Sequence, residues 1–314
     1  MSGEEFVLGI DGGGTSTVAW LASRESRDGF ETFGDGRAGP SNLRVVGFDQ
    51  ASRNVETAVL QAFESAGMVK CPVSAICLAM AGSDRTAERN QWHSWVQARA
   101  FASRQVVVTN DAVPVIFAAD PRGEGVALIA GTGSLALGRV DDGTTARAGG
   151  WGPLIGDEGS GYAIAISGLC AATKAADGRG ESTELLARFC QSLDAEEPSQ
   201  IISAIYSTSF DRPRIASLAS IVFDASAQGD VVACDIIDRA ARDLALMVRA
   251  VIGRLEIDPN TSVLAITGGV ALNQPGFADQ ILRHLRDDSI IFAKTSLEPY
   301  PVAGAVQMAV NALA

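Results

Sequence analysis

FVLGIDGGGT, residues 6–15, is an apolar, β-branched run that ends abruptly at an aspartate, three glycines and a threonine. Such a run predicts a buried strand that leads into a tight turn. The same unit recurs in four further segments: 75–83, 106–112, 125–134 and 263–270. Helix-like stretches lie between these units, at 49–66, 85–102, 160–176, 182–192, 231–255 and 301–313. This alternation predicts an α/β chain.

Two of the units open comparable halves of the chain, because GIDGGGT (9–15) and IAGTGS (129–134) both place a glycine and hydroxyl turn after a strand. After each turn the polarity alternates, which predicts a β-hairpin instead of a strand-to-helix crossover. This differs from a nucleotide fold whose phosphate loop opens a helix. We therefore expect a duplicated architecture. The turn-rich segment Asp120–Gly123 marks the boundary, so that one lobe covers 1–119, completed by the helix at 301–314, and the other covers 120–300.

Composition and charge exclude several classes of partner. The 314 residues carry a net charge of −12 with only three lysines, so the chain lacks the basic surface that grips phosphodiester backbones, and no nucleic-acid partner is expected. No apolar run approaches the ~18 residues of a membrane-spanning helix, and the first residues are acidic where a secretory signal is basic. These features predict a cytoplasmic protein without a membrane partner. The five cysteines show no CxxC spacing and are expected to be reduced and structural.

The first turn has the chemistry of a phosphate site. Gly12, Gly13 and Gly14 lack a Cβ, so their backbone amides can approach an anion closely, and Thr15 adds a hydroxyl donor. A carboxylate directly before such a turn would repel bare phosphate, so we predict that Asp11 holds Mg²⁺, through water, between itself and the phosphates. The alternative is a tight hairpin turn capped by the aspartate.

A second and a third glycine turn extend this interpretation. Thr132 and Gly133 lie in the second turn, and two such turns facing each other could clamp a triphosphate from both lobes. GTGSLA also fits the loose pattern of dinucleotide-binding loops, but a strand and not a helix is expected after it. Gly268 and Gly269 could pack against an adenine or ribose ring. No GxxxxGK[ST] motif exists in the chain, which excludes a Walker-type ATPase.

If a triphosphate is bound here, a second substrate with a hydroxyl group could receive its terminal phosphate. Two aspartates and one asparagine are the candidates for binding that second substrate. Asp111 follows the strand VVVTN, at the sheet edge where α/β folds hold ligands. A carboxylate there can orient a hydroxyl and take its proton, although an aspartate at a strand end can also cap a helix. Asp157 lies in the densest glycine cluster, 149–161, and could accept two sugar hydroxyl hydrogen bonds or cap the helix that follows. Asn42 offers an amide in a polar turn.

Together these segments resemble the N-acetylglucosamine kinase branch of the BadF/BadG/BcrA/BcrD ATPase-like family, within the actin, Hsp70 and hexokinase superfamily. The resemblance covers nearly the whole chain. The motifs that carry it are GIDGGGTST (9–17), PSN (40–42), TNDA (109–112), GTGS (131–134), GGWGPLIGDEGSGY (149–162) and TGGVALN (267–273).

The resemblance implies two RNase H-like, actin-like ATPase lobes with a cleft between them. It implies a kinase that uses ATP and Mg²⁺ to phosphorylate the 6-hydroxyl of an amino sugar, with N-acetylglucosamine as the first expectation. ATP would be held through Thr15 and Thr132, near Ala216, and Asp111 would take the proton. The residues that would contact the sugar are Asn42, Asp111, Ser134, Gly150, Trp151, Gly152 and Asp157.

Two departures from that branch leave other acceptors open. Leu135 stands where animal N-acetylglucosamine kinases have an asparagine, and Leu43 lacks the aromatic neighbour found there. Glucosamine or another hexose is therefore an alternative, because one small apolar contact changes specificity by only ~1–3 kcal/mol.

Two alternatives belong to other functional classes. One is an ATP-hydrolysing activator of a 2-hydroxyacyl-CoA dehydratase-type enzyme, whose iron–sulfur cluster would need thiolates at a dimer interface. Cys170 and Cys190 fall in helix-like segments without an obvious cluster environment. The other is a nucleotide-binding regulator that has lost turnover. Whether the chain forms a homodimer is left open by the sequence.

Overall fold

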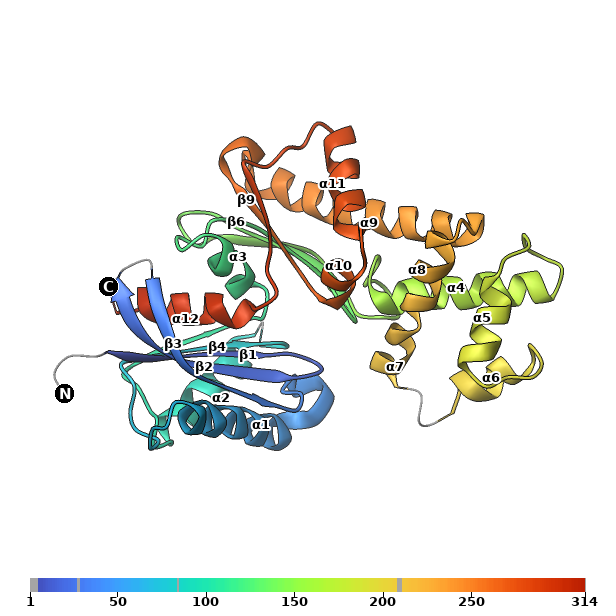
Figure 1. Ribbon diagram of the computed structural model, residues 1–314. Coiled ribbons are helices and arrows are strands. Elements are labelled where there is room, and N and C mark those ends of the chain that lie inside the picture. The colour runs from blue at the N-terminus through green and yellow to red at the C-terminus, as the bar shows by residue number, and fades with distance from the viewer. Residues whose placement is uncertain (1–4, 27–28, 84, 208–210, 314) are drawn as a thin grey trace.

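Two five-stranded sheets built on one plan form the two lobes of the computed structural model (Figure 1). The structure describes residues 5–26, 29–83, 85–207 and 211–313. The predicted α/β fold with two duplicated lobes is confirmed. The first sheet has the order β3-β2-β1-β4-β5, from the strands β1 (Phe6–Gly12), β2 (Thr17–Ser26), β3 (Gly29–Ala38), β4 (Ala75–Met80) and β5 (Gln105–Thr109). The second has the order β10-β9-β6-β7-β8, from β6 (Gly125–Ala130), β7 (Ser134–Arg139), β8 (Thr145–Gly149), β9 (Val263–Thr267) and β10 (Lys294–Leu297).

Each sheet begins with an antiparallel meander of three strands and continues with two parallel strands. Both predicted hairpins are confirmed. The β1–β2 turn is closed by the pair Gly12 and Thr17, and the β6–β7 turn by the pair Ala130 and Ser134. Because the parallel strands β1, β4 and β5 end at one edge, the Asp11 turn and Asp111 come to the same side of the first sheet.

Helices connect and cover the sheets. Those after strands of the first sheet are α1 (Leu43–Ser65), α2 (Thr86–Gln97) and α3 (Val113–Ala119). Those after strands of the second sheet are α4 (Gly161–Ala176), α5 (Leu185–Ser192), α6 (Gln200–Ile205), α7 (Arg212–Ser217), α8 (Ala219–Ala227), α9 (Val231–Leu255), the 3-10 turn η1 (Pro259–Thr261), α10 (Gly269–Asn273), α11 (Phe277–Asp287) and α12 (Pro301–Asn311).

The predicted helices at 49–66, 85–102, 160–176, 182–192, 231–255 and 301–313 correspond to α1, α2, α4, α5, α9 and α12. The first of them matches the part of α1 that follows a break at Gly47, where φ is 72°. The helices α3, α6, α7, α8, α10 and α11 were not expected from the sequence. Most are shorter than ten residues, so they carry too few turns to show a helical period.

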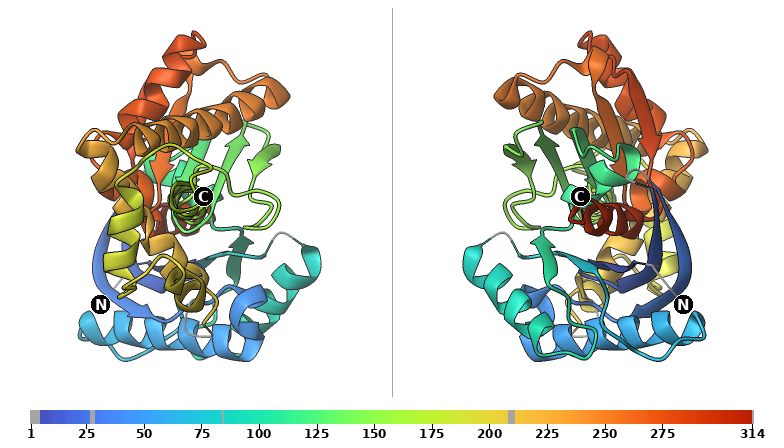
Figure 2. Two further views of the ribbon diagram at one scale, coloured as in Figure 1. Left: turned by 90° about the vertical axis from the view of Figure 1, so that its right-hand side faces the viewer. Right: turned by 90° about the vertical axis from the view of Figure 1, so that its left-hand side faces the viewer.

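The lobes exchange a helix. The first sheet packs on one side against α1 and α2, and α12 covers its other side. In the same way the long helices α4 and α9 cover one side of the second sheet, and α3 covers the other. Thus α3 lies before the predicted lobe boundary at residue 119 yet packs on the second sheet, while α12 packs on the first (Figure 2). Residues 1–4 and 314 of the predicted lobes fall outside the described residues.

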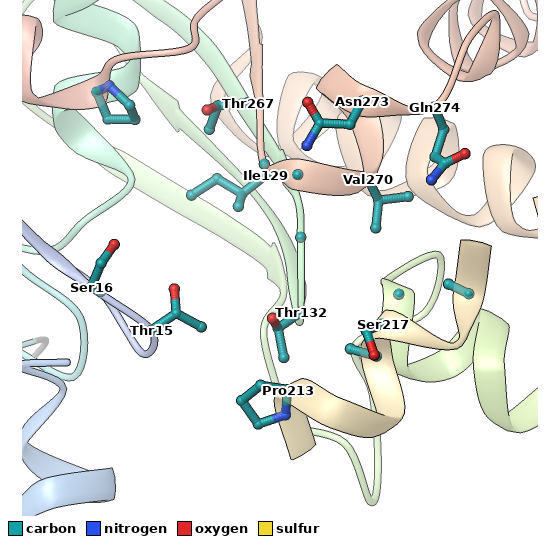
Figure 3. A pocket seen from close by; sticks show the side chains of 18 of the residues that line it. Thr15, Ser16, Ile129, Thr132, Pro213, Ser217, Thr267, Val270, Asn273 and Gln274 are labelled. Atoms are coloured by element: carbon teal, nitrogen blue, oxygen red, sulfur yellow. The ribbon is translucent and has the colours of Figure 1, made fainter. Parts of the chain in front are cut away.

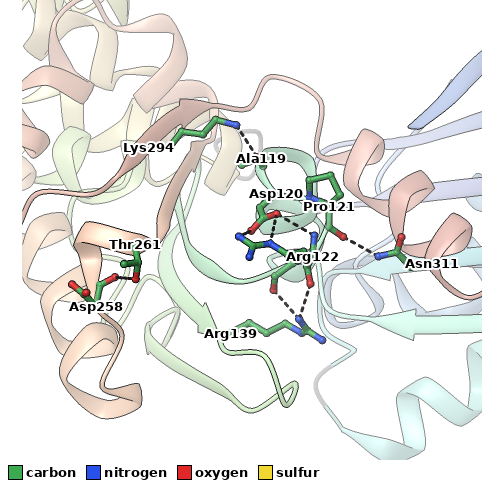
Figure 4. Close-up of polar contacts among 10 residues, drawn as sticks. Ala119, Asp120, Pro121, Arg122, Arg139, Asp258, Thr261, Lys294 and Asn311 are labelled. Atoms are coloured by element: carbon green, nitrogen blue, oxygen red, sulfur yellow. Dashed lines mark hydrogen bonds and ion pairs between the residues drawn. The ribbon is translucent and has the colours of Figure 1, made fainter. Parts of the chain in front are cut away.

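The two exchanged helices meet at the centre of the molecule. A Cβ on Gly304 of α12 would overlap the carbonyl oxygen of Pro114 in α3, so the glycine permits the close crossing. At the far end of this crossing the Asn311 Nδ2 donates to the Pro121 carbonyl at 2.9 Å, and the Lys294 Nζ donates to the Ala119 carbonyl at the end of α3 at 2.8 Å (Figure 4). Side chains from β10 and α12 therefore fix the start of the second lobe.

Within the part of the chain that the structure describes, no single helix has both the length and the apolar character needed to cross a membrane. One bent pair, residues 212–227 and 231–255 at 119° to each other, meets that test by length and composition only.

Candidate active site

A cavity of about 600 Å³ lies between the lobes, at the ends of β1, β6 and β9 (Figure 3). The first lobe lines it with the β1–β2 turn and with Asp111, two residues after β5, and the second lobe lines it with the β6–β7 turn, α7, α8 and the β9–α10 turn. Thr15 and Thr132 approach the cavity from opposite lobes. The lining residues are Asp11, Gly13, Thr15, Ser16, Asp111, Val115, Ile129, Gly131, Thr132, Gly161, Pro213, Ala216, Ser217, Ala219, Ser220, Thr267, Gly268, Gly269, Val270, Asn273, Gln274 and Pro301.

Two carboxylates of the first lobe face this cavity. Burial, together with the negative charge of Asp111, raises the pKa of Asp11 from 3.8 to about 7. None of the described residues that line the cavity is a lysine or arginine. Paired carboxylates without a cation favour a hard divalent ion, and Mg²⁺ in proteins is held by one or two carboxylates together with water and substrate phosphates. The residues present therefore fit a Mg²⁺ ion.

Asn110 lies between β5 and α3. Its Oδ1 accepts hydrogen bonds from the backbone N–H groups of Ala112 and Val113, each at 3.1 Å. These two bonds shape the turn that leads into α3, whose N-cap residue is Ala112 and not Asp111. Asp111 lines the cavity, two residues after the end of β5.

The glycine-rich loop between β8 and α4 has an unusual backbone. Gly149, Gly150, Gly152 and Gly159 all adopt positive φ, which explains the glycine density, because side chains are disfavoured in that region. Asp157 also adopts the left-handed conformation, with φ of 59°. Aspartate is one of the few residues other than glycine that enter this region readily.

Three contacts define the surroundings of Asp157. Its side chain is 3 % exposed and accepts a hydrogen bond from the Gly152 N–H at 3.2 Å. It also forms an ion pair with Arg212 of α7. The cap of α4 is Ser160, whose hydroxyl accepts from the Ala163 N–H at 3.2 Å. The capping alternative for Asp157 is therefore wrong, since Ser160 fills that role.

The predicted nucleotide residues and the predicted sugar residues separate in the structure. Eight predicted residues line the cavity: Asp11, Gly13, Thr15, Asp111, Thr132, Ala216, Gly268 and Gly269. Nine predicted residues do not belong to its lining: Gly12, Gly14, Asn42, Gly133, Ser134, Gly150, Trp151, Gly152 and Asp157. Of the predicted sugar residues only Asp111 lines the cavity, so the cavity gathers mainly the residues that were predicted to hold the nucleotide.

Several of these outlying residues hold the loops in place. The Ser134 hydroxyl donates to the Glu158 carbonyl at 2.6 Å and so fastens the glycine-rich loop to the β6–β7 turn. The Asn42 Oδ1 accepts from the Arg44 N–H at 3.0 Å and caps α1, which leaves its NH₂ group to donate. Trp151 is 67 % exposed, with the Arg147 guanidinium 5.7 Å from its ring centre.

Apart from Ala216, the wall of the cavity that α7 and α8 form was not predicted from the sequence. Pro213, Ser217 and Ser220 of α7 and α8 line it, and Asn273 and Gln274 stand on the opposite side (Figure 3). The start of α7 did carry a signal, because Asp211 caps the helix by accepting from the Arg214 N–H at 3.0 Å and a proline follows in the first turn.

Comparisons with known proteins find relatives over nearly the whole chain. The model of the BadF/BadG/BcrA/BcrD ATPase family matches residues 8–306. The N-acetylmuramic acid/N-acetylglucosamine kinase of Clostridium acetobutylicum is 34% identical over 281 residues, which cover 90% of each chain. The N-acetyl-D-glucosamine kinase of Dictyostelium discoideum is 28% identical over 96% of this chain and 92% of that protein. A candidate N-acetylglucosamine kinase from Chromobacterium violaceum superposes with a TM-score of 0.76 at 21% identity, over 98% of this chain and 99% of that one, and so shares the fold.

Proposed function

We propose that this chain, which belongs to the BadF/BadG/BcrA/BcrD ATPase family, is an ATP-dependent sugar kinase that phosphorylates the 6-hydroxyl of an N-acetylated amino sugar. One observation carries the proposal. Asp11 and Asp111 share an interlobe cavity that Thr15 and Thr132 line from opposite lobes. Phosphoryl transfer needs little more from a protein than such positioning and charge stabilisation.

Asp111 is proposed as the catalytic base. It lines the cavity two residues after the end of β5, and the preceding Asn110 accepts from the backbone N–H groups of Ala112 and Val113 at the start of α3. A carboxylate at this place can accept a hydrogen bond from the acceptor hydroxyl, orient its oxygen towards the γ-phosphate and take the proton as the new bond forms.

The two glycine turns are proposed to hold the triphosphate. Backbone amides of the turns and the hydroxyls of Thr15 and Thr132 are donors on the two sides of the cavity. Asp11 would hold Mg²⁺, through water, at the same place. When bound, that ion would neutralise phosphate charge. Gly268, Gly269 and Ala216 would border the adenosine.

The sugar is proposed to lie between Asp111 and the glycine-rich loop, in contact with Asp157 and Asn42. N-acetylglucosamine is the first expected acceptor, because both curated relatives carry it in their names. The relative from Clostridium acetobutylicum also acts on N-acetylmuramic acid by its name, so this larger amino sugar is the second candidate. A cytoplasmic location stays a prediction.

An ADP-release assay with purified protein, ATP and Mg²⁺ tests the proposal. The panel contains N-acetylglucosamine, N-acetylmuramic acid, glucosamine and glucose, and the product is identified by mass and by the position of its phosphate. We expect sugar-dependent ADP release that is fastest with an N-acetylated sugar. ADP release at one rate with every sugar and without any sugar would contradict the proposal.

A matched pair of variants tests the base. Asp111→Asn keeps the shape of the side chain but cannot take a proton, and it is expected to lower kcat by roughly 100- to 10,000-fold. Asp142→Asn makes the same change in the exposed β7–β8 turn and should leave kcat unaltered. Normal turnover by Asp111→Asn would assign the proton transfer to another group.

A further inference from the structure

Arg212 stands where three parts of the site meet. It is the first residue of α7, the short helix whose following residues Pro213, Ala216 and Ser217 line the cavity. Its guanidinium forms an ion pair with Asp157 of the glycine-rich loop. It also lies against the β6–β7 turn, because a Cβ on Gly133 would be 2.6 Å from the Arg212 Nη2 and 2.9 Å from the Asp157 Oδ2.

From this arrangement we infer that Arg212 is a positioning residue that couples the nucleotide subsite to the sugar subsite. The inference rests on the proposed function. Arg212 does this by holding the Asp157 carboxylate in its place while its own backbone is part of the helix beside the nucleotide.

The cost of burying the Asp157 carboxylate explains why it needs a cationic partner such as Arg212. The carboxylate is almost fully buried, on a backbone with φ of 59°. A buried carboxylate is costly unless it is paired, and an arginine fixes its orientation as well as its charge. A second donor to this carboxylate, from the described residues, is the Gly152 N–H. Removing Arg212 therefore leaves a buried charge that is free to turn away from the sugar.

Arg212 also retains donor capacity. Its side chain is 40 % exposed, yet its Nε is buried and has no acceptor among the described residues. A buried donor without a partner in a native structure calls for an explanation, and a site that is completed by substrate oxygen atoms is one. The guanidinium can hold Asp157 and still donate to a ligand, because it carries five N–H donors.

Coupling between the subsites follows from this position. A nucleotide that packs against α7 would restrain Arg212 and, through the ion pair, Asp157. Bound nucleotide would therefore raise the affinity for the sugar. By linkage, bound sugar would raise the affinity for the nucleotide by the same factor. The direct contact of Arg212 with the Gly133 turn adds a second route between the β6–β7 phosphate turn and the glycine-rich loop.

Arg212→Met tests the inference, with Arg214→Met as the matched control on the same helix. Arg214 is exposed and does not line the cavity. We expect Arg212→Met to lower kcat/KM for the sugar about 100-fold, the loss typical of a small misplacement in a site. Arg212→Lys, which keeps the charge but not the fork of donors, should lose less, and Arg214→Met should match the wild type.

Two readouts distinguish positioning from a general structural role. The first is calorimetric titration of a non-hydrolysable ATP analogue with and without sugar. We expect sugar to tighten nucleotide binding about 5- to 100-fold in the wild type and hardly at all in Arg212→Met. The second is the double variant with Asp157→Asn, which should be no worse than the poorer single variant, because both act through one interaction.

The possible failures are separable. Absence of sugar-dependent turnover in the wild type would remove the proposed function itself. Turnover by the wild type together with normal kcat/KM in Arg212→Met would overturn only the role of Arg212. Losses that multiply in the double variant, or an unchanged tightening of nucleotide by sugar in Arg212→Met, would overturn it as well. If Arg212→Met does not fold, the same measurements on Arg212→Lys decide.

Discussion

The two β-hairpins at the cavity have one architecture and different chemistry. The first closes with Gly12 opposite Thr17 and the second with Ala130 opposite Ser134. One residue before the closing pair, the first hairpin carries Asp11 and the second carries Ile129, and both line the cavity. Of the two turns that are proposed to bind phosphate, only the first therefore has a carboxylate at this position.

This difference shows how a duplicated fold can bind an asymmetric ligand. A triphosphate with its metal needs acidic oxygen ligands on one side, and a second carboxylate from the other lobe would add repulsion to the cavity. The connections that follow the two three-stranded meanders also carry different side chains at equivalent places. The β3–α1 connection carries Asn42 and the β8–α4 connection carries Asp157, so equivalent loops are the proposed sugar contacts from both lobes.

The largest effect is expected where the hairpins differ. Asp11→Asn should lower kcat roughly 100- to 1,000-fold, the loss typical of removing one preorganised electrostatic group. Ile129→Val, at the equivalent place in the second hairpin, should change kcat very little. The measurement is ADP release at several Mg²⁺ concentrations. Equal losses in the two variants would mean that the hairpins are not functionally distinct.

The sequence was sufficient for the part of the site that follows from strand ends. Asp11, Thr15, Asp111 and Thr132 all stand at or within a few residues of the ends of apolar strands, and such positions meet at sheet edges. On the wall formed by α7 and α8 only Ala216 was predicted, and that from the family resemblance, because short helices do not display a period.

Two further features could not be predicted from the sequence, because they depend on tertiary contacts. The pairing of Arg212 with Asp157 joins residues far apart in the chain, and no local pattern encodes such a contact. In the same way, the exchange of α3 and α12 between lobes depends on which sheet each helix packs against. Those packing partners lie outside the segments that contain the helices.

The carboxylate of the first hairpin should also make the ligand-free protein sensitive to pH. Because the pKa of Asp11 is raised from 3.8 to about 7, the folded state holds the proton more tightly than the unfolded state. The contribution of the protonated Asp11 side chain to the free energy of unfolding is complete below pH 3.8 and is lost as pH rises through 7. At ~1.4 kcal/mol per pKa unit, the free energy of unfolding should be roughly 2–3 kcal/mol lower at pH 8 than at pH 5 from this group alone.

Denaturant unfolding at the two pH values, in EDTA and without nucleotide, measures this effect. Asp11→Asn removes the titrating group and serves as the reference, and the predicted quantity is the difference between the wild type and this variant. Identical pH dependence in both proteins would show that Asp11 titrates normally.

The exchanged helices offer a test of how the lobes are joined. Gly304→Ala places a methyl group against the Pro114 carbonyl and must push α12 away from α3, which should lower the free energy of unfolding by about 1–3 kcal/mol. Gly253→Ala, at an exposed position of α9 where no atom lies within 4 Å of the new Cβ, should raise it by about 0.4–1 kcal/mol. Thermal and urea unfolding compare the two. Equal behaviour would mean that the helix crossing is not tight.

The smallest effect tests what the hairpins share. Thr17 and Ser134 open the second strand of each hairpin, and each buried hydroxyl fastens the connection that leads to the next helix. Thr17 donates to the Gly39 carbonyl at 2.7 Å, and Ser134 donates to the Glu158 carbonyl at 2.6 Å. Thr17→Val and Ser134→Ala should each lower the free energy of unfolding by about 1 kcal/mol, the usual value of one such hydrogen bond. Because Glu158 is next to Asp157, Ser134→Ala should also raise the KM for the sugar, whereas a change in stability without any change in KM would place the Glu158 connection outside the sugar subsite.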